Sequence, residues 1–423
     1  MGKMSNNNFY RTGSRKFHDA PAFIGYVVVT LIVNSIYILY GNQSTKPKNF
    51  SFPMPTILIA SGICLVTLVC FMFISFLLFP EFMLHFGCLA GPLLLIAIAL
   101  LSNESMFIIM SCIGAGISLF IYFFYLRKNI KYTATILKAS TKIIMKNILG
   151  IVTIIFISSC LQILQLFILL MNENKKVENN FFLYFIFILQ SFWTLANIAY
   201  FMRVYVGTII SLTLFKDTAG EFSSLGFEAL KNSLLALGSI CLGGFLLALV
   251  TTLRLLLDKN EHENRERRNI AGQIFAMILS VLLSILEDII KCANDWSFSY
   301  LAVHGKSYVE SVKGSWNVVI RGKNSVLINS LCITPILGIF QILFVAIYAF
   351  IIGLTVSDIP ELFSETRIIG TASTIFITMF SLISFAAIFD AATKSFLFSY
   401  AEDSSVVNDL PKVKEALREQ DSK

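Results

Sequence analysis

Residues 181–202 read FFLYFIFILQSFWTLANIAYFM, a run without a single charged side chain. A helix needs about 20 predominantly apolar residues to cross the hydrocarbon core of a bilayer. Lipid offers the backbone no hydrogen-bond partner, so a segment that spans it must satisfy its own N–H and C=O groups as a helix. This stretch therefore predicts a transmembrane α-helix.

The composition of the whole chain indicates that this helix is one of many. Of 423 residues, 56% are hydrophobic and only 14% are charged. A typical soluble domain carries roughly 25% charged residues. Too little polar surface remains to cover a soluble globule of this size. A soluble enzyme, a disordered chain and a disulfide-stapled secreted module are all excluded.

Runs of comparable length and hydrophobicity recur along the chain, and they are continuous rather than alternating. We predict an all-α polytopic membrane protein, a bundle of about ten transmembrane helices. Residues 21–400 form the transmembrane, transporter-like domain, between cytoplasmic tails at 1–20 and 401–423. The ten predicted spans are Ala22–Tyr40, Thr56–Phe79, Phe82–Leu101, Met106–Leu126, Ile148–Met171, Phe181–Met202, Leu234–Leu257, Ile270–Ile290, Val326–Leu354 and Ile369–Ala391.

The distribution of Lys and Arg predicts the orientation. With both termini in the cytoplasm, 23 of the 33 Lys and Arg residues fall inside, as the positive-inside rule favours. Three glycosylation sequons, at Asn42, Asn49 and Asn103, then lie in outside loops. The stretch DKNEHENRERR at 258–268 opposes this assignment, because ten spans place it outside. Either the rule fails locally, or residues 203–216 form a broken or re-entrant extension of the sixth span.

The sixth span carries a polar stripe. Its members are three and four residues apart and so share one helix face: Gln190, Trp193, Thr194, Asn197 and Tyr200. An aromatic face with hydrogen-bonding neighbours suits an organic cation, which makes the stripe a candidate substrate path. The alternative is a helix–helix contact joined by interhelical hydrogen bonds. The sequence leaves both open.

Glu287 is the acidic residue of greatest interest in the eighth span, where it shares a face with Ser280, Ser284 and Lys291. An acid inside a membrane is a candidate counter-charge for a cation or a carrier of protons. An ion pair with Lys291, four residues away, is the structural alternative. Again both hypotheses stay open.

Catalytic chemistry finds little support in the sequence. The four His residues are scattered, and no HExxH, G-x-S-x-G or Walker-type motif occurs. The eight Cys residues form no CxxC pair. We expect no enzyme activity, no metal, no cofactor and no direct coupling to ATP, and no nucleic-acid partner in spite of the net charge of +7.

Three blocks of the carboxy-terminal half resemble the choline transporter-like family, solute carrier family 44, and in particular its fungal branch. They are GSICLGG at 238–244, LEDIIKCAN at 286–294 followed by SYLAVHGKSYVES at 299–311, and DAATKSFLFSYAED at 390–403. The resemblance covers about residues 181–411, and it implies that Trp193 and Glu287 occupy positions in the family's core. The chain departs from the family pattern at Gly244, where a Ser is usual.

The resemblance implies facilitated movement of a small organic cation of the choline or ethanolamine type. We expect Trp193, Asn197, Tyr200 and Glu287 to form its site, in a multi-pass protein of the plasma membrane rather than an internal membrane. The cation and the lipid bilayer are the expected partners, and the sequence identifies no protein partner. The alternative is a non-transporting membrane protein that acts through protein partners in membrane traffic.

Overall fold

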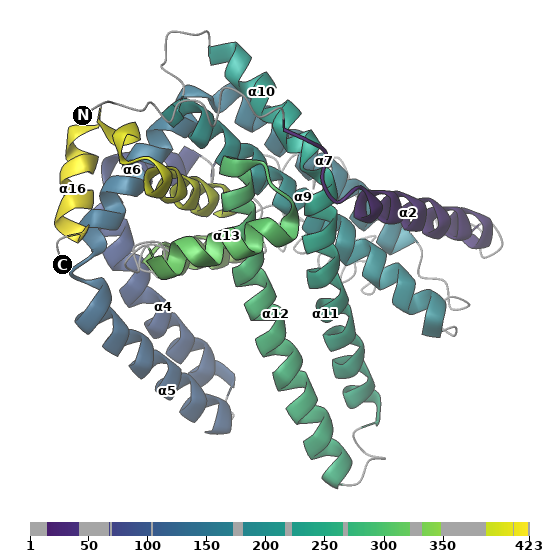
Figure 1. Cartoon of the computed structure of the whole chain (residues 1–423). Helices are drawn as coiled ribbons and strands as arrows, with labels where there is room; N and C mark the ends of the chain where they lie inside the picture. Colours follow the sequence, from purple (N-terminus) through teal and green to yellow (C-terminus); the bar gives the residue numbers. More distant parts are fainter. Residues whose placement is uncertain are drawn as a thin grey trace, which may run out of the picture. The chain divides into compact units, whose positions relative to one another are not determined.

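The computed structural model describes residues 15–41, 67, 70–102, 105–171, 181–215, 222–264, 270–321, 332–347, 386–408 and 410–421. Throughout these residues the regular structure is helical, with no β-strand (Figure 1). The predicted all-α class is confirmed.

The helices follow the apolar runs of the sequence. Between the named elements, further helical segments occupy residues 70–78, 332–347 and 386–402. The named elements are α2 (Ala20–Gly41), α4 (Pro80–Ser102), α5 (Ser105–Ile121), the π-helical turn η1 (Tyr122–Leu126), α6 (Ile130–Lys146), α7 (Ile148–Met171), α9 (Phe181–Phe215), α10 (Phe222–Leu235), α11 (Leu237–Asn264), α12 (Ile270–His304), α13 (Tyr308–Arg321), the 3₁₀ turn η2 (Ser404–Val407) and α16 (Pro411–Asp421).

Several of these helices are long and apolar enough to cross a membrane. In the described ranges they are four: Pro80–Ala97, Ile108–Leu126, Phe181–Phe215 and Leu237–Leu257. A fifth is counted if α6 and α7, which are bent by 85° with respect to each other, form one broken span. This supports a multi-pass membrane protein. The count of ten stays a prediction, because two predicted spans, Thr56–Phe79 and Ile369–Ala391, lie largely outside the described residues.

Two helices run past the ends of the predicted spans. Residues 203–215 extend the sixth span, as one of the two alternatives had it, but without a break, because α9 runs unbroken to Phe215. Helix α12 likewise continues to His304 rather than ending near Ile290. Arg203 Nη2 and Asp295 Oδ1 are 3.1 Å apart, so each of these charges is neutralised inside its helix. The predicted seventh span, in contrast, is interrupted at Ala236, between α10 and α11.

The chain divides into two units, and each is described by itself. Unit 1 comprises residues 1–50, 153–208 and 227–316, and in it α11 packs against α2 and α12. One hydrophobic cluster of this unit gathers side chains of α9, α11, α12 and α13, together with the residue between α10 and α11. Its buried members are Tyr200, Val204, Ala236, Ile240, Phe298, Leu301, Ala302 and Tyr308.

Unit 2 comprises residues 51–152, 209–226 and 317–423, and in it α4 packs against α5 and α6, and α6 against α16. Gly87 of α4 lies directly on the backbone of Ile336, a close approach that a residue without a side chain permits. Helix α6 buries Ile136 and Ile144 and exposes Lys142. It is an amphipathic helix.

Candidate functional site

The candidate site lies inside unit 1, at the packed faces of α2, α9, α11 and α12. Trp193, Asn197 and Tyr200 of α9 are all buried there, with 6%, 7% and 6% of their surfaces exposed. Their contacts run to α11 and α12, as the spacing of three and four residues requires. The structure thus brings three of the four predicted site residues onto one internal face.

Trp193 anchors an aromatic cluster. Its indole Nε1 donates a hydrogen bond to the carbonyl oxygen of Cys241 at 2.8 Å. The ring centroids of Tyr26 and Phe245 lie 5.2 Å and 4.9 Å from that of Trp193. Tyr26 donates from its hydroxyl to Thr194 Oγ1 at 3.1 Å, which fixes the ring beside the stripe. We call Tyr26, Trp193 and Phe245 the aromatic cluster.

Asn197 lies one turn further along α9. Its Nδ2 donates to Cys241 Sγ at 3.5 Å, while its buried Oδ1 has no hydrogen-bond partner in the described part of the chain. Gly244 lies beside that oxygen, since a Cβ on Gly244 would overlap Asn197 Oδ1. A buried acceptor without a donor costs about 1–3 kcal/mol. Asn197 Oδ1 is therefore a buried acceptor without a donor among the described residues.

Tyr200 belongs to a hydrogen-bond network centred on Asn294 of α12. Asn294 Nδ2 donates to the hydroxyl of Tyr200 at 3.2 Å and to the carbonyl oxygen of Gly243 at 3.0 Å. Asn294 Oδ1 accepts from the hydroxyl of Tyr308 at 2.6 Å. One amide thereby connects α9, α11, α12 and α13. Such a fully satisfied network rigidifies the interior next to the aromatic cluster.

Glu287 stands apart from these residues. Its side chain is buried, and its carboxylate lies 2.6 Å from Lys291 Nζ and 2.9 Å from Arg254 Nη1. The predicted contact with Lys291 is present, and Arg254 of α11 is a second cation that the sequence did not indicate. The partners of Glu287 are these two cations, not members of the aromatic cluster.

The other end of the stripe faces a different helix. Gln165 of α7 donates from Nε2 to Gln190 Oε1 at 3.2 Å. Gln190 in turn donates to Thr194 Oγ1 at 3.1 Å. This part of the stripe is a helix contact joined by hydrogen bonds, the second of the two alternatives. The face that carries Trp193 and Asn197 meets α11 instead.

Four residues of this region were not predicted from the sequence as site residues: Tyr26, Phe245, Asn294 and Tyr308. Tyr26 and Phe245 are single aromatic residues in apolar helices, and no periodic pattern distinguishes them. Asn294 and Tyr308 lie inside the quoted block at 286–311, which was the available signal. The predicted sequons at Asn42, Asn49 and Asn103 lie outside the described residues.

Several apolar helices long enough to cross a membrane define a multi-pass integral membrane protein. Residues 109–405 match the family model described as plasma-membrane choline transporter. The chain therefore belongs to the choline transporter-like family.

Several curated proteins are similar to parts of the chain. Protein PNS1 of Saccharomyces cerevisiae is 31% identical over 118 residues, which are 27% of this chain and 22% of that protein. A CTL-like protein of Dictyostelium discoideum is 32% identical over 92 residues, 22% of this chain and 16% of that protein. Protein PNS1 of Mycosarcoma maydis is 25% identical over 138 residues, 31% of this chain and 26% of that protein. The matched segments thus span about a quarter or less of each relative.

Proposed function

We propose that this protein moves a small organic cation of the choline or ethanolamine type across a membrane without hydrolysing ATP. The observation that carries the proposal is the aromatic cluster next to the unsatisfied Oδ1 of Asn197, buried among apolar helices. Aromatic faces attract ammonium groups through the ring quadrupole. An amide oxygen without a donor suits the hydroxyl of choline or the ammonium hydrogens of ethanolamine.

Each predicted site residue has a role in this mechanism. Trp193, with Tyr26, supplies the aromatic face, Asn197 orients the substrate, and Tyr200 fixes α9 against α12 through Asn294. Glu287 acts as a distant counter-charge once Arg254 or Lys291 withdraws from it. The Arg254 side chain is 39% exposed, so it can leave the carboxylate without crossing a packed interior.

The rings of the aromatic cluster pack against one another, so admission of a substrate requires α9 and α11 to separate. The contact between Gly244 and Asn197 supports such a motion, because small residues allow helices to approach and part with little repacking. Rocking of helices about contacts of this kind would expose the cluster alternately to the two sides of the membrane.

The same proposal includes the arrangement in the membrane. About ten spans between residues 21 and 400, both tails in the cytoplasm, and location in the plasma membrane follow the charge pattern and the description of the family. Asn42 and Asn49 are then glycosylated outside. A mobility shift on glycosidase treatment that is absent from the Asn42→Gln/Asn49→Gln variant tests their side.

The test of transport is uptake of labelled choline into proteoliposomes that hold the purified full chain. Trp193→Leu removes the aromatic face, and we expect it to raise the apparent KM about tenfold, since a desolvated cation–π contact is worth about 1–2 kcal/mol. Glu287→Gln should abolish saturable uptake. Trp316→Leu is the matched control, because Trp316 is 57% exposed on α13 and lies outside the cluster.

Uptake that is saturable in wild type, unchanged in Trp316→Leu and weakened in Trp193→Leu would support the site. Equal KM values for Trp193→Leu and wild type would refute the aromatic face. No uptake above empty liposomes, by wild-type protein with a cooperative thermal transition, would overturn transport of choline. It would favour a non-transporting membrane protein that acts through protein partners.

A further inference from the structure

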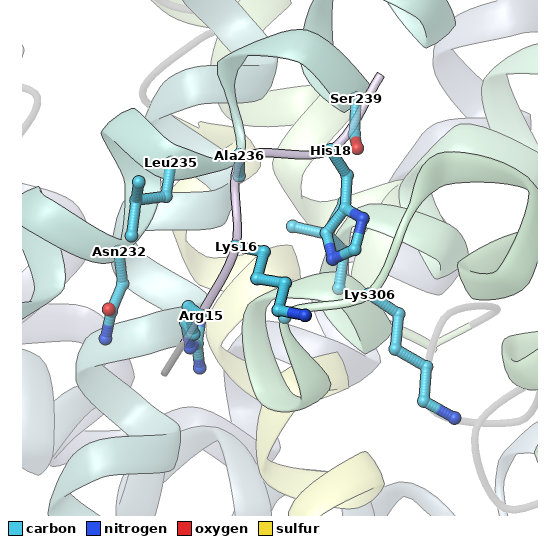
Figure 2. A pocket seen from close by; sticks show the side chains of 10 residues that line it. Arg15, Lys16, His18, Asn232, Leu235, Ala236, Ser239 and Lys306 are labelled. Atoms are coloured by element: carbon cyan, nitrogen blue, oxygen red, sulfur yellow. The ribbon is translucent and has the colours of Figure 1, made fainter. Parts of the chain in front are cut away.

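Unit 1 also contains a basic pocket, which differs in composition from the aromatic cluster. Four of the side chains that line it are basic (Figure 2). The N-terminal segment, the junction of α10 with α11 and the turn between α12 and α13 all contribute. Its basic residues are Arg15, Lys16, His18 and Lys306. Lys16 and Lys306 are exposed, and Figure 2 shows both side chains in the same region as the His18 ring.

The pocket is built by docking of the N-terminal segment at two points. Arg15 Nη2 donates to the carbonyl oxygens of Ala302 and Val303, at 2.8 Å and 3.3 Å, in the last turn of α12. Asp19 Oδ2 accepts from Ser239 Oγ at 2.6 Å and from the backbone N–H of Tyr308 at 2.8 Å. Residues 16–18 are therefore held between two fixed ends.

The charge of the pocket is one-sided. Among the described residues, the lining contains no carboxylate, and the acid at the end of the segment, Asp19, is already bonded to Ser239 and Tyr308. His304 lies beside the pocket, well beyond the predicted span of α12, and its pKa is affected by the same positive charges. Burial, together with the smaller effects of the positive charges of Lys306 and Arg15, lowers the pKa of His304 to about 3. A protonated histidine is unfavourable where an anion would be favourable.

We propose that this pocket binds the phosphate group of an anionic lipid, with Lys16 and Lys306 as its principal ligands and Arg15 and His18 beside them. Ammonium and guanidinium groups form short, charge-assisted hydrogen bonds to phosphate oxygens. A phosphomonoester, which carries close to two negative charges, matches several cations at one place.

The position of the pocket favours a lipid as the source of the phosphate. Phe17, between the two basic positions of the segment, is 40% exposed, and its ring lies 5.7 Å from that of Phe23 in an edge-on contact. The apolar helix α2 begins at Ala20, directly after the segment. Exposed aromatic rings next to basic residues at the start of an apolar helix are typical of the headgroup level of a membrane.

The experiment is binding to the purified full chain in detergent, followed by calorimetry. Three probes are compared: a short-chain phosphatidic acid, the matching phosphatidylcholine and inorganic phosphate. The double variant Lys16→Gln/Lys306→Gln should weaken binding of phosphatidic acid at least tenfold. Lys313→Gln removes an exposed charge of α13 outside the pocket and should leave binding within twofold. Arg15 is kept, because it holds the end of α12.

The outcomes separate the sources of the phosphate. Tight binding of phosphatidic acid with weak binding of inorganic phosphate assigns the pocket to a lipid headgroup. Comparable binding of inorganic phosphate, also lost in the double variant, overturns the lipid and points to a soluble phosphate compound. Equal binding of phosphatidylcholine and phosphatidic acid, or no effect of the double variant, overturns the site altogether. Binding alone decides the matter, so the result is independent of whether the protein transports choline.

Discussion

Asp19 combines two tasks that substitutions can separate. Its carboxylate accepts two hydrogen bonds, from Ser239 Oγ and the Tyr308 amide, and its backbone lies in the left-handed region at φ 53°. Asp19→Ala loses both the bonds and the tolerance of Asp for that backbone. Asp19→Gly loses the bonds alone, because Gly adopts a positive φ freely. Asp19→Asn keeps one acceptor oxygen and the backbone tolerance.

The magnitudes follow from these losses. A hydrogen bond to a charged group contributes about 1.5–3 kcal/mol when buried, and less for a half-buried group such as Asp19. We therefore expect the segment to detach more easily by about 2 kcal/mol in Asp19→Gly. In Asp19→Ala the left-handed backbone adds about 1 kcal/mol. The expected order of docking stability is wild type, then Asn, then Gly, then Ala.

Trypsin cleavage after Arg15 or Lys16 measures docking, because the bond is accessible only when the segment opens. When reclosing is fast, the cleavage rate follows the population of the open form. About 2 kcal/mol corresponds to roughly 30-fold faster cleavage of Asp19→Gly than of wild type, and Ala should be roughly fivefold faster again. Asp288→Asn, an exposed acid of α12, is the control. Cleavage of Asp19→Ala no faster than that of Asp19→Gly would refute the backbone argument, and wild-type rates for both would refute the docking itself.

Three further predictions concern stability in detergent, measured as the midpoint of thermal unfolding. Gly87→Ala should lower the free energy of unfolding by about 1–3 kcal/mol, because the added Cβ would lie 2.7 Å from the Cα of Ile336. Gly116→Ala is the control and should not destabilise the protein, because open space surrounds Gly116. Equal midpoints for the two variants would contradict the close contact. Lys394→Met should lower the free energy of unfolding by about 3–5 kcal/mol, because it removes the ammonium group that lies 2.7 Å from the buried carboxylate of Asp390. Adding Asp390→Asn to this variant should recover most of the lost stability. The pKa of His304 is lowered to about 3 in the folded protein, so the unfolded chain takes up its proton first and stability falls as the pH drops below about 6.5. His304→Gln should therefore lose less of its midpoint than wild type between pH 7 and pH 5, and parallel losses would rule out His304 as the group responsible.

The sequence predicts the helices well where hydrophobicity alone decides them. The predicted span Ile148–Met171 coincides with α7, and Ala22–Tyr40 differs from α2 by two residues at the start and one at the end. It fails at the ends of α9 and α12. The predicted spans end at Met202 and Ile290, whereas the helices continue to Phe215 and His304. The ion pair of Arg203 with Asp295 joins these extensions, and a contact between two separate helices cannot be read from the sequence.

The candidate site divides in the same manner. The shared face of Trp193, Asn197 and Tyr200 follows from helical periodicity, and the structure places all three on it. Periodicity cannot say what that face meets. Tyr26, which contacts Trp193, precedes it by more than 160 positions in the chain, and the Arg254 ion pair of Glu287 joins two separate helices.

The thiol of Cys241 offers a chemical probe of the site. Its carbonyl oxygen accepts from Trp193, its sulfur accepts from Asn197, and its side chain is buried. A maleimide cannot reach this sulfur while α9 and α11 are in contact. In a chain in which the other seven Cys residues are replaced by Ser, the alkylation rate of Cys241 measures the opening of the interior. Saturating choline would lower the alkylation rate of Cys241 if it stabilises the packed helices and raise that rate if it stabilises the separated ones.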